Sequence, residues 1–314
     1  MNKNKNILII GGYGFLGQGI LKTFNNKNYQ VSILDKNLEP QKLIQYKLKH
    51  LFKYSTLENE KMDYALNTEN WDYIIHLAAF VGSGNGLLKA ADEDFQQAIN
   101  INVTGFANLL NKLKSHKNTK FIWSSSTVVF GEEINYNNNS VDENSILNPT
   151  TNYGLTKLMA EEVAKFYIKN YKMNITGIRL PIIIGPDLNY RGVAAGISDM
   201  AHYINKDFKV KIDMPSSPLD IIYIKDAANI FIKMITTNTK LKNIYNCPSI
   251  RTNALKLANN FNKISKKNNL KINNIGKGST YPIMEYHKLK KDINFSMKYN
   301  INKLIKDWLK EIAI

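Results

Sequence analysis

The chain carries a tyrosine and a lysine four residues apart, Tyr153 and Lys157, in a segment that predicts a helix over Asn152–Tyr171. Side chains with this spacing share a helix face, so we expect the phenol and the ammonium to point into the same cleft. A free tyrosine has a pKa of ~10, and a fixed positive charge beside it favours the phenolate. The pair therefore predicts a tyrosine that acts as a general base near neutral pH.

A glycine-rich segment near the N-terminus predicts binding of a pyrophosphate. Gly11, Gly14 and Gly17 lie between a strand-like apolar run and a segment with helical spacing. Glycines let the backbone approach a phosphate closely, and a helix N-terminus presents unpaired amides. Asp35 ends the second predicted strand, where a carboxylate accepts hydrogen bonds from ribose hydroxyls and repels a 2′-phosphate. We therefore expect NAD, rather than NADP, as the cofactor.

Hydroxyl side chains gather at the end of the predicted strand Phe121–Ser124. Ser124, Ser125 and Ser126 follow one another there. Doubly wound sheets bind ligands at the carboxyl ends of their strands. We expect these hydroxyls to lie at the ligand-binding edge.

Strand-like and helix-like segments alternate through the first half of the chain. The predicted strands are Asn6–Ile10, Tyr29–Leu34, Tyr73–Leu77, Phe121–Ser124 and Asn174–Leu180, and the predicted helices are Gly14–Phe24, Asp94–Lys114 and Asn152–Tyr171. The alternation predicts a doubly wound, Rossmann-like α/β fold with a parallel sheet. We expect an NAD-binding domain over residues 1–180 and a smaller C-terminal α/β substrate domain over 181–314, with residues 219–247 packing back on the first domain.

Composition excludes several classes of protein. The 314 residues include 44% hydrophobic ones but no run of eighteen apolar residues, so no transmembrane helix is predicted. The short, glycine-broken apolar stretch after Lys5 differs from a signal peptide, and we expect a cytoplasmic protein. Cys247 is the single cysteine, which excludes an intrachain disulfide. The five histidines show no metal-binding spacing, so we expect no metal site.

The formal charge of +16 raises the question of a polyanionic partner. Only three of the 42 basic residues are arginines, whereas nucleic-acid interfaces favour arginine. Lysine, asparagine and isoleucine share AT-rich codons, which accounts for most of this charge. We expect neither a nucleic acid nor a membrane as partner, although residues 251–314 hold 14 basic and 4 acidic residues and carry about ten of the net charges.

The motifs taken together resemble the extended short-chain dehydrogenases/reductases, in particular the NAD-dependent nucleotide-sugar epimerase/dehydratase family. The resemblance covers nearly the whole chain. It rests on the glycine turn, Asp35, His76–Ala79, Asn102–Gly105, Ser124–Gly131, Tyr153 with Lys157, Arg179–Pro181, Gly185–Pro186 and Leu219–Ala227.

The resemblance implies a role for each matching residue. Tyr153 would remove a proton from a sugar hydroxyl, Lys157 would hold the nicotinamide ribose and tune Tyr153, and Ser126 would hydrogen-bond the reacting oxygen. NAD would be held by the glycine turn with its neighbours: Gly11, Gly14, Phe15, Leu16, Gly17, Asp35 and Ala78. Asn102 would support the active-site helix from inside the fold. The family also implies a homodimer formed through the helices Asp94–Lys114 and Asn152–Tyr171.

Departures from the family pattern narrow the reaction. Sugar 4,6-dehydratases carry Asp-Glu where this chain has Thr127-Val128, and neither residue can shuttle a proton as a carboxyl does. The glutamate of uronate decarboxylases and the Ser-Cys pair of the reductases that make GDP-fucose are also missing. Hydride chemistry at one carbon remains. We expect oxidation of the 4-hydroxyl of an NDP-hexose or NDP-heptose, by a 4-dehydrogenase or a 4-epimerase, for polysaccharide biosynthesis.

Other departures concern the substrate. Ile182 and Leu219 replace an asparagine and an arginine that contact the nucleotide sugar in many members. Arg191 is a candidate for contacting the diphosphate instead, because a guanidinium binds phosphate bidentately. The small-residue loop Gly82–Gly86 leaves room for a sugar and favours a heptose, such as a GDP-heptose, over a hexose. Two alternatives stay open: a dehydrogenase of a free sugar acid or small alcohol, and a non-catalytic dinucleotide-sensing protein.

Overall fold

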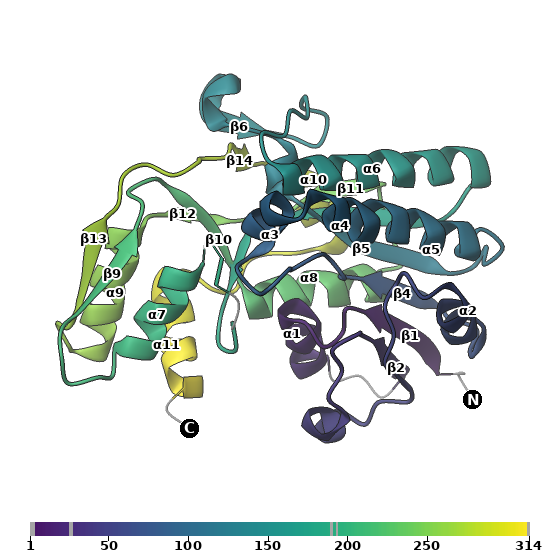
Figure 1. Cartoon of the computed structure of the whole chain (residues 1–314), viewed down its shortest axis with the longest axis horizontal. Coiled ribbons are helices and arrows are strands. Elements are labelled where there is room, and N and C mark those ends of the chain that lie inside the picture. Colours follow the sequence, from purple (N-terminus) through teal and green to yellow (C-terminus); the bar gives the residue numbers. More distant parts are fainter. Residues whose placement is uncertain (1–3, 25–27, 189–190, 193, 313–314) are drawn as a thin grey trace.

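The centre of the molecule is a seven-stranded sheet in which every neighbouring pair of strands is parallel (Figure 1). The computed structural model describes residues 4–24, 28–188, 191–192 and 194–312. In spatial order the strands are β11 (Ile244–Asn246), β7 (Ile175–Leu180), β5 (Lys120–Ser126), β4 (Tyr73–His76), β1 (Lys5–Ile10), β2 (Tyr29–Leu34) and β3 (Leu51–Phe52). The order reverses between β1 and β4, where doubly wound sheets bind ligands.

Alternate residues of each central strand face opposite helical layers. Ile7 and Ile9 of β1 pack toward α1 (Phe15–Thr23), α8 (Ile224–Thr236) and α10 (His287–Ile293). Leu8 and Ile10 pack toward α2 (Asn59–Asn67), α5 (Phe106–Leu113) and α6 (Asn152–Tyr171). Figure 1 shows α1 and α8 on the side of the sheet away from α5 and α6. Burial on both faces explains the continuous apolar run of β1.

Smaller sheets form a second lobe with its own apolar core. Strands β12 (Ile250–Thr252), β10 (Leu219–Tyr223) and β8 (Ile182–Ile184) make a three-stranded sheet, and β9 (Val210–Met214) pairs with β13 (Leu270–Asn274). Around them lie α7 (Ala195–Tyr203), α9 (Ala254–Ser265) and α11 (Ile301–Ile312), at the left of Figure 1. Strands β6 (Ser140–Val141) and β14 (Ile283–Met284) form a separate pair at the top.

The predicted fold class is confirmed, and several predicted elements match within a few residues. The predicted helix Asp94–Lys114 differs: it consists of α4 (Phe95–Ile99), a π-helical segment η2 (Asn100–Gly105) and α5, and the short helix α3 (Leu87–Glu93) precedes it. Short 3-10 segments lie at η1 (Pro40–Tyr46), η3 (Thr127–Val129), η4 (Glu133–Asn135) and η5 (Asn137–Asn139). The division at residue 180 stays a prediction. Among the described residues, no helix combines the length and apolar character needed to cross a bilayer.

Candidate active site

The glycine turn joins β1 to α1, and at Gly11 and Gly17 it leaves no room for a side chain. Gly11 has a φ of +80°, and a Cβ built on it would lie 2.7 Å from the backbone nitrogen of Ala78. A Cβ on Gly17 would lie 2.6 Å from the carbonyl oxygens of Gly11 and Gly12. Gly14 is the N-cap of α1, and no side chain caps the helix. The first amides of α1 are therefore available to an anion.

Asp35 lies beside this turn at the end of β2. Its Oδ2 accepts a hydrogen bond from the backbone amide of Tyr13 at 3.1 Å, and its Oδ1 accepts one from the amide of Asn37 at 3.0 Å. These bonds hold the carboxylate at the rim of a hollow of about 190 Å³, which Gly11, Gly14, Asp35 and Ala78 help to line. The hollow lies at the switch point of the sheet, so these residues fit the adenosine and diphosphate part of a dinucleotide.

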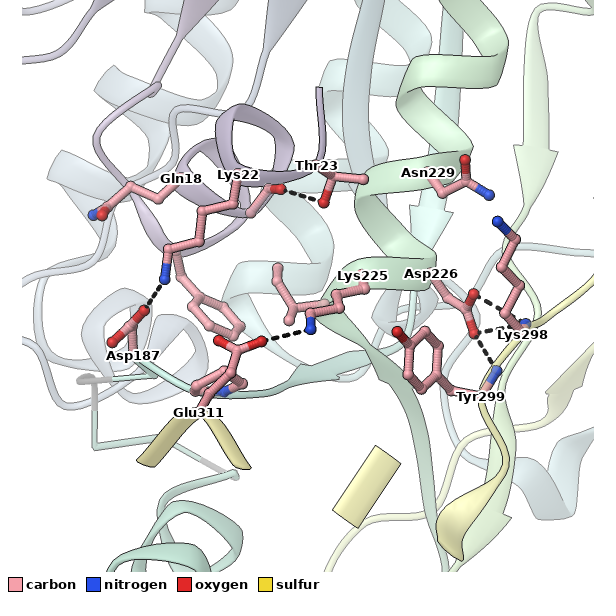
Figure 2. Close-up of a pocket in the computed structure, with 14 residues that line it drawn as sticks. Gln18, Lys22, Thr23, Asp187, Lys225, Asp226, Asn229, Lys298, Tyr299 and Glu311 are labelled. Atoms are coloured by element: carbon pink, nitrogen blue, oxygen red, sulfur yellow. Dashed lines mark hydrogen bonds and ion pairs between the residues drawn. The ribbon is translucent and has the colours of Figure 1, made fainter. Parts of the chain in front are cut away.

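Phe15 and Leu16 of the predicted cofactor set direct their side chains elsewhere. Phe15 lines a larger hollow of about 390 Å³ between α1, α8 and α11 (Figure 2), and Leu16 packs against the apolar cores. Ion pairs of Lys22 with Asp187 and of Lys225 with Glu311 cross this hollow. Only the backbone amides of Phe15 and Leu16, in the first turn of α1, stay available to a cofactor.

Tyr153 and Lys157 lie on one buried face at the start of α6. Thr151 caps the helix by accepting a hydrogen bond from the amide of Gly154. The Lys157 ammonium lies 5.7 Å from the centre of the Tyr153 ring and donates to the carbonyl oxygen of Ser124 at 2.9 Å. Burial lowers the pKa of Lys157 to about 8, and the Glu161 carboxylate opposes that shift. A buried ammonium held this close to the Tyr153 ring is suited to stabilising the phenolate form of the tyrosine.

Ser126 is the last residue of β5 and is half-buried. Its Oγ accepts a long hydrogen bond of 3.4 Å from the amide of Val128. The turn after Ser126 meets the start of α6 closely, because a Cβ on Gly154 would lie 2.4 Å from the carbonyl oxygen of Val128. The fold thus brings the end of β5 against the helix turn that carries Tyr153.

Asn102 supports the start of α6 through hydrogen bonds, and a buried histidine, His76, lies near Lys157. Asn102 accepts a hydrogen bond from the amide of Phe80 at 2.8 Å and donates to Thr156 Oγ1 at 3.0 Å. These contacts match the supporting role that the resemblance implies for Asn102. His76 is buried, its Nε2 has no hydrogen-bond partner among the described residues, and burial lowers its pKa to about 3. The imidazole is therefore neutral near pH 7.

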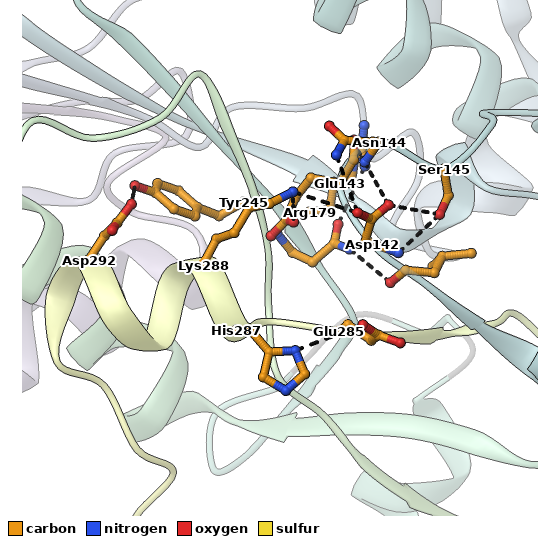
Figure 3. A network of polar contacts seen from close by, with 12 residues as sticks. Asp142, Glu143, Asn144, Ser145, Arg179, Tyr245, Glu285, His287, Lys288 and Asp292 are labelled. Atoms are coloured by element: carbon orange, nitrogen blue, oxygen red, sulfur yellow. Dashed lines mark hydrogen bonds and ion pairs between the residues drawn. The ribbon is translucent and has the colours of Figure 1, made fainter.

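An ion pair behind Lys157 was not foreseen from the sequence. Glu161 of α6 and Arg179 of β7 are each about 2% exposed and pair bidentately, at 2.9 and 2.8 Å. Ser125 Oγ donates to the same carboxylate at 2.7 Å. Figure 3 shows Arg179 beside a second polar group, in which Lys288 pairs with Glu143 at 2.9 Å. Positions 153, 157 and 161 share one helix face, and this spacing is the sequence signal that could have pointed to Glu161.

Arg191 lies at the rim of the loop Gly82–Gly86. Its backbone amide donates to the carbonyl oxygen of Gly84 at 2.7 Å, and its exposed guanidinium pairs bidentately with Asp199 at 2.6 and 2.9 Å. A diphosphate would have to compete with this carboxylate. Val193, in the glycine-bordered segment 191–196, lies outside the described residues. Among those that are described, no group of three His, Cys, Asp or Glu side chains could hold a metal ion.

Comparisons with known proteins identify the family of this chain. The sequence model of the NAD dependent epimerase/dehydratase family matches residues 7–247. A dTDP-D-glucose 4,6-dehydratase of Dictyostelium discoideum is 34% identical over 199 residues, which span 57% of this chain and 44% of that protein. A putative UDP-glucose 4-epimerase of Methanocaldococcus jannaschii is 28% identical over 242 residues, 76% of each chain.

The fold also matches solved structures along nearly its whole length. A UDP-glucose 4-epimerase of Thermotoga maritima, determined with UDP-glucose, superimposes with a TM-score of 0.84 over 98% of both chains, at 21% sequence identity. This likeness concerns the fold.

Proposed function

Because this chain belongs to the NAD dependent epimerase/dehydratase family, we propose that it oxidises the 4-hydroxyl of a nucleotide-activated hexose or heptose to a 4-keto sugar. It does so either as a 4-dehydrogenase or as the first half of a 4-epimerase. NAD, when bound, supplies the hydride acceptor. The observation that carries the proposal is the buried Lys157 ammonium, which lies 5.7 Å from the Tyr153 ring and is fixed to the carbonyl of Ser124.

The residues divide the work of this reaction. Tyr153 takes the proton of the sugar hydroxyl, and Ser126 donates a hydrogen bond to the same oxygen. Lys157 stabilises the phenolate and binds the nicotinamide ribose. The turn at Gly11 receives the diphosphate, and Asp35 accepts hydrogen bonds from the adenosine ribose. Its negative charge favours NAD over NADP, because a 2′-phosphate would be repelled.

Dehydration is disfavoured although a dehydratase is among the relatives. Eliminating water needs an acid and a base beside the catalytic hydroxyl. Thr127 and Val128 occupy that place and are both buried. Val128 packs in the same apolar cluster as Tyr153. This environment supports hydride transfer at one carbon without a second proton shuttle.

A smaller alcohol or a free sugar acid is the second candidate substrate, and two side chains favour it. Leu219 is buried in the core of the second lobe, and Ile182 packs against that core. Neither offers a polar contact to a nucleotide. Arg191 favours a nucleotide sugar as the substrate instead, provided that its diphosphate displaces Asp199 from the Arg191 guanidinium. Competitive protection by UDP or GDP would distinguish the nucleotide sugar from the smaller substrate.

We also propose a homodimer formed through α5 and α6. The outer face of α6 exposes Met159, Phe166 and Tyr171, and Phe166 is 55% exposed. Phe166 and Tyr171 form an aromatic group with Tyr167, which also packs against the core beneath the helix. Large exposed apolar side chains that gather on one helix are typical of protein interfaces.

A panel of UDP-, GDP- and dTDP-sugars incubated with the NAD-loaded protein tests the proposed function. Oxidation with release of the product would accumulate reduced cofactor, measured at 340 nm, and a 4-keto sugar, identified by mass spectrometry. An epimerase would yield the 4-epimer without net reduction. Turnover of free sugar acids alone, unaffected by UDP or GDP, would replace this proposal with the second candidate.

A further inference from the structure

Three buried polar side chains join the strand of Ser126 to the helix of Tyr153. Ser125 and Arg179 are directly opposite each other in the parallel pair β5 and β7. The Glu161 carboxylate bridges them, accepting from Ser125 Oγ at 2.7 Å and from the Arg179 guanidinium at 2.9 and 2.8 Å. All three side chains belong to buried residues. The bridge therefore fixes α6 against two strands by directional bonds as well as by apolar packing.

The far side of Arg179 is also held in place. Its guanidinium lies 4.7 Å from the centre of the Phe130 ring and donates to Asn246 Oδ1 at 3.4 Å. Phe130 follows the turn that begins at Ser126, and Asn246 belongs to β11. Because Arg179 is constrained from several elements, it offers Glu161 a rigid counter-charge.

Glu161 also lies one helix turn beyond Lys157, on the same face. The groups that face Lys157 are Tyr153 and Glu161 on α6, the Ser124 carbonyl and the Trp123 ring on β5, and His76 on β4. His76 is neutral near pH 7, since its pKa is lowered to about 3. Burial disfavours the charged form of Lys157, and the Glu161 carboxylate opposes that effect. Arg179 faces Glu161 from β7 and partly cancels its charge.

We propose that Glu161 is a positioning residue for the reaction: it fixes α6 against β5 through Ser125 and Arg179, and it places an anion one turn from the Lys157 ammonium. This inference rests on the proposed function for its kinetic consequence. Its electrostatic consequence is independent of the substrate. Removing the Glu161 carboxylate takes away the charge that favours the protonated form of Lys157 and leaves the Arg179 cation without its counter-charge. The loss of the anion favours loss of the lysine proton.

Glu161→Gln and Arg179→Met test the proposal by the sign of their effects. Both remove the bridge, but Glu161→Gln removes the anion and Arg179→Met removes the cation that opposes it. We expect the titration of Lys157 to move down by about one pH unit in Glu161→Gln and to move up in Arg179→Met. A purely structural role would move both variants in the same direction. Glu162→Gln is the matched control, because Glu162 is an exposed neighbour that pairs with the exposed Lys165.

Two measurements read the shift. The first is the NMR titration of the lysine 13Cε signal in the full-length protein, with Lys157 assigned by the loss of its signal in Lys157→Ala. The second is the alkaline limb of the pH profile of nicotinamide reduction, which we expect to move with the NMR value. If no sugar nucleotide reduces the cofactor, the proposed function fails, but the NMR titration still decides the role of Glu161.

Folding of the variants is controlled by a paired substitution. A single change leaves a buried charge without its partner, whereas Glu161→Gln combined with Arg179→Met leaves none. We expect the double variant to fold and still to titrate Lys157 below wild type. An unchanged titration in both Glu161→Gln and the double variant, or shifts of the same sign in Glu161→Gln and Arg179→Met, would overturn the proposal.

Discussion

Replacing Gly11 with alanine should weaken both the fold and the binding of NAD. Gly11 has a φ of +80°, and the added methyl would lie 2.7 Å from the backbone nitrogen of Ala78. A left-handed backbone costs a residue other than glycine about 1–2 kcal/mol, and pressing a methyl into a packed site costs about 1–3 kcal/mol. We therefore expect the free energy of unfolding to fall by about 2–5 kcal/mol.

Gly276→Ala is the matched control for this change. Gly276 also has a positive φ, of +105°, but nothing lies within 4 Å of an added Cβ. It should lose only the backbone part, about 1–2 kcal/mol, as measured by chemical denaturation. Calorimetric titration should show NAD binding weakened about tenfold or more in Gly11→Ala, equivalent to about 1.4 kcal/mol, and unchanged in Gly276→Ala. Wild-type NAD affinity in Gly11→Ala would refute the reasoning.

Three further predictions concern cofactor choice, acid stability and assembly. Asp35→Ser should weaken NAD binding and raise the affinity for NADP relative to NAD, measured as two dissociation constants; an unchanged ratio would argue against ribose recognition by Asp35. Burial lowers the pKa of His76 from the ordinary histidine value of 6.5 to about 3 in the folded protein. Its contribution to stability is therefore complete above pH 6.5 and is lost as the pH falls toward 3, by about 1.4 kcal/mol per pH unit. His76→Phe should flatten that decline in denaturation curves, and an equally steep decline in the variant would contradict it. Phe166→Asp should convert the dimer to a monomer in analytical ultracentrifugation, and a monomeric wild-type protein would remove the basis of this prediction.

The positions of the strands and long helices can be predicted from local patterns in the sequence. The strand Tyr29–Leu34 and the helix Asn152–Tyr171 have the bounds that were predicted. The strand is a run of residues that favour β-structure and ends at a turn. The helix begins at a threonine N-cap. The segment 94–114 shows the limit of such patterns. Its π-helical part, Asn100–Gly105, departs from the 3.6-residue period on which the prediction depends.

Some residues of the candidate site could likewise be predicted from the sequence, and others could not. Gly11, Asp35, Tyr153 and Lys157 could be identified because their spacing along the chain carries the signal. The pairing of Glu161 with Arg179 depends on how α6 lies across β5 and β7, which no local pattern specifies. The ion pair between Arg191 and Asp199 likewise depends on where α7 is placed. Whether Arg191 contacts a diphosphate therefore stays a prediction.

Transfer of the hydrogen on carbon 4 of the sugar tests the central claim most directly. A nucleotide sugar deuterated at carbon 4 would be mixed with the NAD-loaded protein. The cofactor would then be released by denaturing the protein, and its mass would be measured by mass spectrometry. Wild type should give reduced nicotinamide that carries one deuterium. Tyr153→Phe should retain NAD but form no reduced cofactor. Reduced nicotinamide without deuterium, or undiminished reduction by Tyr153→Phe, would contradict oxidation at the 4-hydroxyl with Tyr153 as the base.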